Sequence, residues 1–208
     1  MMRAPVYVDF DDVLCESART LARISGERYG KPVAFEEIYS FDLNQSFGLD
    51  ASEQVDLFTL FHDAEMLYAI PPIPDAIAGM QTWAAAGCRI EIVTGRPPVT
   101  QAVCCEWLDA YKVPYDGITF VDKYRRGHGP VAGVRQMTLE QIAACTFALA
   151  VDDSPEMIEC LAVKTGWPLA LFDRPWNQQL AVGTLRPGTG RYAGWRELLD
   201  AYPAPGVM

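Results

Sequence analysis

Five short runs of apolar residues recur along the chain, and stretches with helical spacing separate them. The runs are rich in β-branched and aromatic residues, so each is expected to be a buried strand. They occupy residues 5–8, 89–94, 118–121, 147–151 and 168–172. Strands and helices that alternate in this way are joined by right-handed crossovers. The pattern therefore predicts an α/β fold, with a parallel sheet flanked by helices.

Several of the intervening stretches carry recognisable helix signals. The stretch 73–86 begins with Pro74 and Asp75 and stops at Gly87, which suits a helix C-terminus. Comparable helices are expected over residues 99–111 and 154–164.

Residues 15–72 break the alternation, because almost sixty residues pass without a convincing strand. Helices are expected over 16–29 and over 52–62, where Asp50 followed by Glu53 resembles a capping box. Aromatic residues are dense in this segment. Most are expected to form the core of a small helical domain, and one or two to line a pocket above the strand ends. The predicted organisation is a core, residues 1–14 and 73–208, with a helical domain, residues 15–72, inserted after the first strand.

The net charge of the chain limits the classes of molecule that it can bind. The chain has 17 basic and 27 acidic side chains, a formal net charge of -10, which argues against binding to a nucleic-acid polymer. A phosphorylated substrate would have to be held locally, through a metal.

The six cysteines form no zinc pattern and are interpreted as buried thiols. No membrane association is expected, because no apolar run approaches 18 residues, and the predicted location is cytoplasmic. The sequence indicates no oligomeric state.

Three carboxylates follow the first apolar run within four residues: Asp9, Asp11 and Asp12. Carboxylates crowded at a strand end require a cation. In open α/β sheets, ligands bind at the carboxyl ends of the strands. This segment is therefore the first candidate for a functional site.

Three further polar clusters follow predicted strands and would converge on Asp9. Thr94, Gly95 and Arg96 offer a hydroxyl and a backbone amide suited to a phosphoryl oxygen. Lys123 comes two residues after the strand at 118–121. Asp152 and Asp153 follow the strand at 147–151 and precede Ser154, which is also suited to capping a helix.

Two other segments lie close to these strand ends. Residues 124–136 follow Lys123 and contain Arg125, Arg126, His128 and Arg135. This loop is interpreted as solvated surface, with a role in gating the site as the alternative. After the last apolar run, Trp176 and Asn177 are expected to tie down the C-terminal loop.

The order of the motifs, D-x-D, then Thr, then Lys, then D-D, each behind an apolar strand, resembles that of the haloacid dehalogenase superfamily. DFDDV and AVDDSPE are its most specific pieces. The resemblance implies a Rossmann-like core, with the helical insert in the C1-type cap position. DFDDVL, VTGRPP and FVDKY look most like the 5'(3')-deoxyribonucleotidase-like group within that superfamily.

The resemblance also implies roles for the motif residues. Asp9 would be the nucleophile that takes up the phosphoryl group, and Asp11 the acid that protonates the leaving oxygen and then activates water. Mg²⁺ would be held by the Asp9 side chain, the Asp11 carbonyl and Asp153. Phosphoryl oxygens would be held by Thr94, the Gly95 amide and Lys123. Asp152 would orient a water or Lys123. The resemblance gives Asp12 no role, so it is interpreted as a supporting or loop-capping acid, and Arg96 is also expected to support the site.

Physical chemistry gives independent reasons for this division of roles. A carboxylate nucleophile divides one difficult displacement into two easier ones, and a second carboxyl two residues on points to the same side of an extended chain. Two acids alone would repel a phosphate dianion. Mg²⁺, a hard cation that prefers oxygen ligands, removes that repulsion.

The leading interpretation is a Mg²⁺-dependent phosphatase acting on a small phosphomonoester, such as a (deoxy)nucleotide 5'-phosphate. A phosphomutase differs only in the acceptor of the phosphoryl group. A haloacid dehalogenase needs neither the second acid nor the metal, so Asp11 and the Asp152–Asp153 pair speak against it. A signalling receiver domain carries its acid pair first and its acceptor later. The remaining alternative is a catalytically idle binding module.

Overall fold

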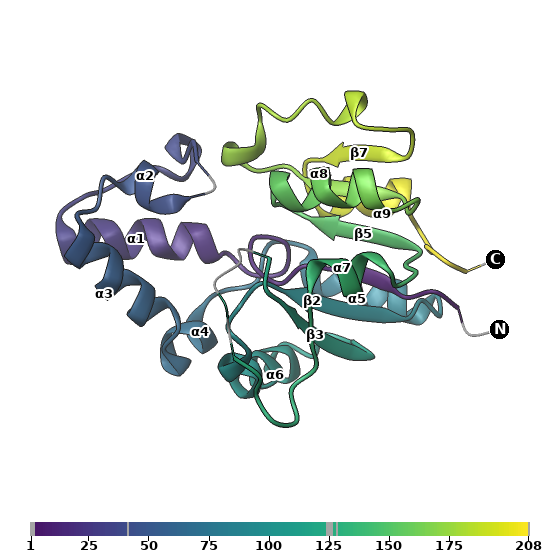
Figure 1. The fold of residues 1–208 in the computed structure, drawn as a ribbon, viewed down its shortest axis with the longest axis horizontal. Coiled ribbons are helices and arrows are strands. Elements are labelled where there is room, and N and C mark those ends of the chain that lie inside the picture. The colour runs from purple at the N-terminus through teal and green to yellow at the C-terminus, as the bar shows by residue number, and fades with distance from the viewer. Residues whose placement is uncertain (1–2, 41, 124–126, 128, 208) are drawn as a thin grey trace.

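The computed structural model describes residues 3–40, 42–123, 127 and 129–207. In these residues the chain forms a seven-stranded parallel sheet in the order β4-β3-β2-β1-β5-β6-β7, with helices on both faces (Figure 1). The strands are β1 Val6–Val8, β2 Ile90–Thr94, β3 Gly117–Val121, β4 Gln136–Met137, β5 Leu149–Asp152, β6 Leu169–Phe172 and β7 Thr189–Tyr192. The predicted α/β fold is confirmed, and β1 lies at its centre.

All five predicted strands are present, and the sequence analysis missed the two edge strands. β4 has only two residues, and β7, with the sequence TGRY, is half-buried and largely polar. Neither carries the continuous apolar run that marks a central strand. Short or polar edge strands are common because they resist pairing with other chains.

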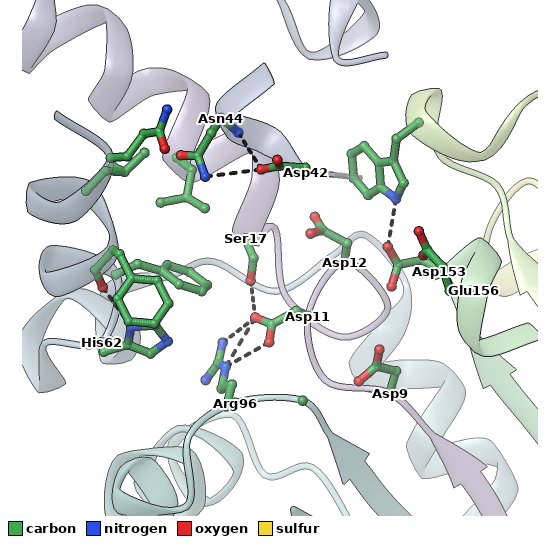
Figure 2. Close-up of a pocket in the computed structure, with 17 residues that line it drawn as sticks. Asp9, Asp11, Asp12, Ser17, Asp42, Asn44, His62, Arg96, Asp153 and Glu156 are labelled. Atoms are coloured by element: carbon green, nitrogen blue, oxygen red, sulfur yellow. Dashed lines mark hydrogen bonds and ion pairs between the residues drawn. The ribbon is translucent and has the colours of Figure 1, made fainter. Parts of the chain in front are cut away.

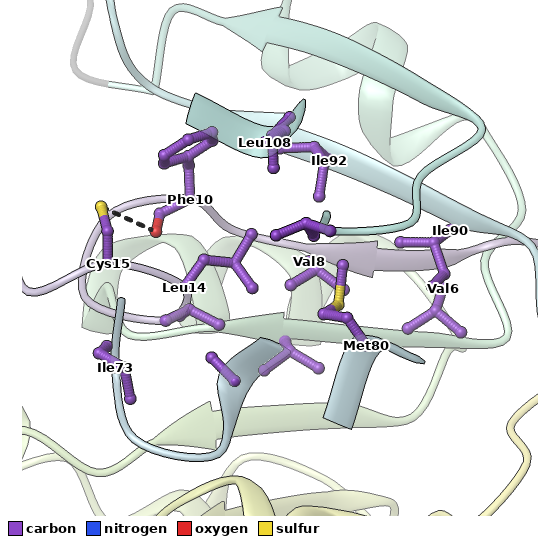
Figure 3. Packing of buried hydrophobic residues seen from close by; sticks show 14 of the residues in the cluster. Val6, Val8, Phe10, Leu14, Cys15, Ile73, Met80, Ile90, Ile92 and Leu108 are labelled. Atoms are coloured by element: carbon purple, nitrogen blue, oxygen red, sulfur yellow. Dashed lines mark hydrogen bonds between the residues drawn. The ribbon is translucent and has the colours of Figure 1, made fainter. Parts of the chain in front are cut away.

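The two faces of the sheet bury separate hydrophobic clusters, which follow the two-residue repeat of the strands. Val6 and Val8 of β1 contact one cluster, together with Met80 and Leu108 (Figure 3). Tyr7 points to the opposite face, where it joins the other cluster.

The three helices predicted for the core are present, as α5 Ala76–Ala85, α6 Gln101–Ala110 and α8 Pro155–Lys164. The core also contains α7 Leu139–Ala143 and α9 Trp195–Ala201, which the sequence analysis did not predict. The Ser154 hydroxyl caps α8 by accepting the Met157 amide at 3.3 Å. α5 begins at Ala76 rather than at residue 73, because Asp75 takes a left-handed conformation, with φ of 64°, just before it.

Helices also fill the segment between β1 and α5, and they lie to one side of the sheet layers in Figure 1. They are α1 Ser17–Tyr29, α2 Leu43–Phe47, α3 Ala51–Phe61 and α4 Ala64–Ala69. The capping box of α3 is present, because Asp50 accepts the Glu53 amide and Glu53 accepts the Asp50 amide. The division at residues 15 and 72 stays a prediction, and "cap" denotes residues 15–72 below.

The two connections between cap and core run side by side. The Ile73 amide donates to the Leu14 carbonyl at 2.8 Å, and the Glu16 amide donates to the Pro71 carbonyl at 2.9 Å. The cap has its own hydrophobic cluster, which includes Leu21 and Leu57 and to which the core contributes Trp176.

All six cysteines, which the sequence analysis interpreted as buried thiols, are free. Cys15, Cys88 and Cys104 are buried as expected, whereas the other three are only half-buried. None of the helices in the described part of the chain is both long and apolar enough to span a membrane.

Candidate active site

Four of the predicted motifs meet where β1, β2, β3 and β5 end. Because β2 and β5 flank β1 and all strands run in parallel, the residues that follow them share one edge of the sheet. Asp9, Gly95, Arg96 and Asp153 line one cavity there (Figure 2). The convergence expected from the sequence is therefore observed.

Lys123 lies between two carboxylates. Its ammonium is 2.7 Å from Asp9 Oδ2 and 2.7 Å from Asp152 Oδ2, and the Lys123 side chain is only 1% exposed. Burial by itself would lower the pKa of Lys123, but the charges of Asp152 and Asp9 outweigh it and raise that pKa. The lysine is therefore held in its charged form.

Three buried acids gather around this lysine. Asp9, Asp152 and Asp153 each place one carboxylate oxygen within 4.8 Å of the others. Burial and then the charge of Asp152 raise the pKa of Asp9, and burial and then the charge of Asp12 raise the pKa of Asp153. Buried like charges with too little positive charge between them shift in this direction. A divalent cation with oxygen ligands would relieve the repulsion, so the donor set fits Mg²⁺.

The two adjacent acids differ in the bonds that they already make. Asp152 Oδ2 accepts from the Tyr7 hydroxyl at 2.6 Å as well as from Lys123, and Asp152 Oδ1 accepts the Ser154 amide at 2.9 Å. Both oxygens of Asp152 are thus occupied. Asp153 Oδ2 accepts from Trp176 Nε1 at 2.9 Å, and the described residues donate no hydrogen bond to Asp153 Oδ1. Of the pair, Asp153 is the better placed to bind a metal.

The Asp11 carboxylate points away from Asp9, toward Arg96 and Ser17 (Figure 2). Arg96 Nη2 donates to Asp11 Oδ1 at 2.7 Å, Arg96 Nε donates to Oδ2 at 3.0 Å, and the Ser17 hydroxyl also donates to Oδ1. Burial alone would raise the pKa of Asp11, but the charge and hydrogen bonds of Arg96 lower it overall. Arg96 was expected only to support the site, and sequence reasoning did not foresee this pairing.

Asp12 links the end of β1 to the first cap helix. Its backbone is left-handed, with φ of 54°, and its carboxylate accepts the Ala18 amide of α1 at 3.1 and 3.2 Å. Burial raises the pKa of Asp12 to about 7, although the nearby charge of Arg174 acts to lower it. Arg174 Nε donates to the Asp12 carbonyl at 2.9 Å.

Thr94 and Gly95 differ in their access to the cavity. Thr94 is fully buried, and its hydroxyl accepts the Arg96 amide at 3.1 Å, whereas Gly95 lines the cavity. The turn after β2 is therefore held by its own threonine.

The cavity, of about 330 Å³, lies between the core and the cap. Its cap side offers an apolar surface from Leu21, Leu57, Phe58 and Phe61, and the core adds Trp176. Six of the described lining residues carry carboxylates, and one carries a guanidinium. The acidic lining residues are Asp9, Asp11, Asp12, Asp42, Asp153 and Glu156, and the guanidinium is that of Arg96.

Residues beyond the predicted motifs also shape the site. Trp176 bonds Asp153, and Asn177 Nδ2 donates to the Asp153 carbonyl at 2.9 Å, so these residues do more than tie down a loop. The sequence signal for this role was their position just after a predicted strand, which places them at the same edge of the sheet as the motifs. In the loop 124–136, Arg125, Arg126 and His128 lie outside the described residues, and Arg135 pairs with Glu91 at 3.0 Å, away from the cavity.

Comparison with solved structures identifies the fold. The chain is similar to a HAD family hydrolase from Deinococcus radiodurans R1 with bound phosphate and sodium, at a TM-score of 0.65 and 17% identity, over 99% of this chain and 97% of that one. It is also similar to a predicted phosphatase from Clostridium acetobutylicum, at a TM-score of 0.59 and 12% identity, over 98% and 99% of the two chains. A third similar structure is a putative beta-phosphoglucomutase from Thermotoga maritima, at a TM-score of 0.56 and 17% identity, over 96% of this chain and 98% of that one. At these identities the likeness concerns the fold.

Sequence comparison identifies the family. No curated protein matches the chain. The family model described as "5' nucleotidase, deoxy (Pyrimidine), cytosolic type C protein" matches residues 3–132, which is more than half of the chain. The matched segment contains the D-x-D motif, the cap, Thr94 and Lys123. The chain therefore belongs to this 5' nucleotidase family of the haloacid dehalogenase superfamily, and it is a hydrolase that acts on phosphomonoesters.

Proposed function

We propose that the chain is a Mg²⁺-dependent phosphatase that hydrolyses a small phosphomonoester through an aspartyl-phosphate on Asp9. The observation that carries this proposal is the position of Asp9, whose carboxylate is paired with buried Lys123 and gathered with Asp152 and Asp153. The pairing holds a carboxylate oriented for attack at the end of a rigid strand. Family membership supports the same reaction class.

The Asp9 and Asp153 side chains and the Asp11 backbone carbonyl would hold Mg²⁺. Mg²⁺ would neutralise part of the phosphate charge that three buried carboxylates would otherwise repel. Trp176 would orient Asp153 through its hydrogen bond, as outer-shell partners do at metal sites.

The residues of the chain divide the remaining chemistry between them. Asp9 attacks phosphorus while Lys123 keeps its carboxylate in place and spreads the negative charge that develops on the phosphoryl oxygens. The Gly95 amide would hold the same oxygens from the cavity wall, and the buried Thr94 hydroxyl, which among the described residues only accepts from the Arg96 amide, would donate its own proton to one of them. Asp11 gives a proton to the leaving oxygen and later takes one from the attacking water.

The cavity supports a substrate with one phosphoryl group and a flat or apolar leaving group, and we propose a (deoxy)nucleoside 5'-monophosphate. Leu57, Phe58 and Trp176 offer apolar surface to such a group. The acidic lining disfavours a second anionic group. The description of the matched family supports the nucleotide assignment and a cytoplasmic location.

Phosphate release from a panel of phosphomonoesters tests the proposal. The panel holds p-nitrophenyl phosphate, deoxynucleoside 5'-monophosphates and sugar phosphates, each assayed with Mg²⁺ and with EDTA. We expect Mg²⁺-dependent release that Asp9→Asn abolishes. Asp116→Asn is the control, because Asp116 bonds the Ile90 amide at the opposite end of β2 and should not matter for turnover.

Release that persists undiminished in Asp9→Asn would overturn the assignment. Absence of release from every ester would favour a binding module. Transfer of the phosphoryl group to a sugar phosphate in place of water would indicate a phosphomutase.

A further inference from the structure

The segment that follows β6 holds Asp153 at two points. Trp176 Nε1 donates to Asp153 Oδ2, and Asn177 Nδ2 donates to the Asp153 carbonyl, each at 2.9 Å. Both donors belong to one short 3-10 helix, Pro175–Asn177. Whatever keeps this helix in place therefore also keeps the side chain and the backbone of Asp153 in place.

The amide of Asn177 is buried, at 1% exposure, and is bonded at both ends. Its Oδ1 atom accepts from Arg191 Nη1 at 2.6 Å and from the Arg174 amide at 3.2 Å. Its Nδ2 atom donates to the Phe172 carbonyl, also at 2.9 Å, as well as to that of Asp153. Two donors face the amide oxygen and two acceptors face the nitrogen, so only one orientation of the amide satisfies all of them.

Arg191 of the edge strand β7 holds this segment from the side away from the cavity. In addition to its bond to Asn177 Oδ1, Nη1 donates to Asp173 Oδ1 at 2.5 Å. Nη2 donates to the carbonyls of Asn177 and Leu180, each at 2.8 Å. One guanidinium thus bonds residues at the start, the middle and the end of the segment 173–180. The rigid fork of arginine can serve several fixed acceptors at once, which the single ammonium of lysine does less well.

We propose that Arg191 is a positioning residue for the metal site: it fixes the Asn177 amide and the segment 173–180, and through them it fixes Asp153. This inference rests on the proposed function, in which Asp153 is a ligand of Mg²⁺. Arg191 takes part in no chemical step, and it is not among the described residues that line the cavity. Its contribution is to hold Asp153 ready before an ion binds, because a ligand that is already ordered loses less conformational freedom on binding.

The test measures the dissociation constant (Kd) of Mg²⁺ by isothermal titration calorimetry of the full chain without substrate, so the readout does not depend on turnover. Loss of an outer-shell partner typically costs about 10–100-fold in metal affinity. Arg191 acts one residue further out, so we expect Arg191→Gln to raise the Kd by about tenfold, the lower end of that range. A merely structural role would lower Tm without changing the Kd.

Arg186→Gln is the matched control. Arg186 is also a half-buried arginine between β6 and β7, and its guanidinium donates to the Trp167 and Pro187 carbonyls. Trp167 precedes β6, so these bonds lie at the opposite end of that strand from Asp173. Arg186→Gln should lower Tm and leave the Kd for Mg²⁺ unchanged.

A double-mutant cycle tests whether Arg191 acts through Asn177. Asn177→Ser removes the amide and should itself raise the Kd. Arg191→Gln added to Asn177→Ser should raise the Kd by less than it does in the wild type, because one of the routes to Asp153 is already lost. Arg191→Lys keeps the charge without the fork, so it should raise the Kd by less than Arg191→Gln, and it keeps the test decisive if Arg191→Gln does not fold.

Three results would overturn the inference: an unchanged Kd in the folded Arg191 variants, an equal rise in Arg186→Gln, or an undiminished effect of Arg191→Gln in the Asn177→Ser background. In each of these cases the wild type still binds Mg²⁺ and releases phosphate, so the proposed function stands. Failure of the proposed function looks different, because the wild type would then bind no Mg²⁺ or Asp9→Asn would remain active.

Discussion

The ammonium of Lys123 lies 2.7 Å from Asp9 Oδ2 at the buried end of the central strand. Asp152 holds the same ammonium from the other side at 2.7 Å. Lysine thereby bridges a carboxylate that faces the cavity and one that does not. This bridge ties the orientation of Asp9 to β3 and β5.

Replacing Lys123 by Gln should abolish phosphatase activity and also destabilise the fold. Breaking a buried ion pair by removing one partner costs about 3–5 kcal/mol, because the remaining charge is left uncompensated. Urea denaturation in EDTA measures the loss of unfolding free energy. Lys164→Gln is the control, because its pair with Glu140 is exposed and such pairs are worth about 0–1 kcal/mol. Equal losses of unfolding free energy in Lys123→Gln and Lys164→Gln would show that the bridge formed by Lys123 contributes little to stability.

Asp153→Asn and Asp152→Asn should have different consequences for Mg²⁺. Asp153 has an oxygen without a hydrogen bond from the described residues, whereas both oxygens of Asp152 are bonded. We expect Asp153→Asn to raise the Mg²⁺ concentration for half-maximal activity strongly, and Asp152→Asn to lower kcat with a smaller change in that concentration. Mg²⁺ titrations of phosphate release measure both. A larger increase in this Mg²⁺ concentration for Asp152→Asn than for Asp153→Asn would make Asp152 the direct ligand.

Trp176→Phe should weaken Mg²⁺ activation while preserving the apolar surface. The change removes the indole that donates to Asp153 at 2.9 Å, and loss of an outer-shell partner typically costs about 10–100-fold in metal affinity. Trp83→Phe is the matched control, since its indole donates to the Tyr202 carbonyl within the core, outside the cavity. Similar Mg²⁺ titrations for the two variants would argue against a role for Trp176 at the metal.

Without metal, stability should fall as pH rises from about 4 to about 7. Asp12 has a folded-state pKa of about 7 against an ordinary value of 3.8, so between these values the folded chain binds more protons than the unfolded chain. The raised pKa values of Asp9 and Asp153 act in the same direction, and the lowered pKa of Asp11 matters only as pH falls through the acidic range.

The size of this effect is measurable by thermal denaturation in EDTA. One pKa unit corresponds to about 1.4 kcal/mol, and 1 kcal/mol moves Tm by about 2–4 °C in a chain of this size. A fall in Tm of at least about 4 °C between pH 5 and pH 7 is expected, and Mg²⁺ at pH 7 should restore it. A Tm that rises over this interval in EDTA would contradict the prediction.

The convergence of the motifs was predictable from sequence because it depends only on strand order and direction. Each motif directly follows an apolar run, and parallel strands bring such positions to one edge. Asp9 and Lys123 could thus be placed at one site although they lie 114 positions apart in the sequence. The five central strands were predictable for a related reason, since burial on both faces leaves a continuous apolar signature.

Features that depend on side-chain direction or on weak local signals were not predictable. Nothing in the sequence fixes which acid Arg96 would face, because that choice depends on the packing of Phe10 and Cys104 around it. The contact of Trp176 with Asp153 joins residues that follow different strands. The helix expected from residue 73 begins only at Ala76, because Asp75 takes a left-handed backbone conformation that the sequence pattern does not reveal.

The central claim is that Asp9 carries the phosphoryl group during turnover. Acid quenching of the Mg²⁺-loaded protein during hydrolysis of a ³²P-labelled ester, followed by peptide mapping, tests it most directly. The account predicts label on the peptide that contains Asp9 in the wild type and none in Asp9→Asn. Label on another residue, or phosphate release that continues in Asp9→Asn, would contradict it.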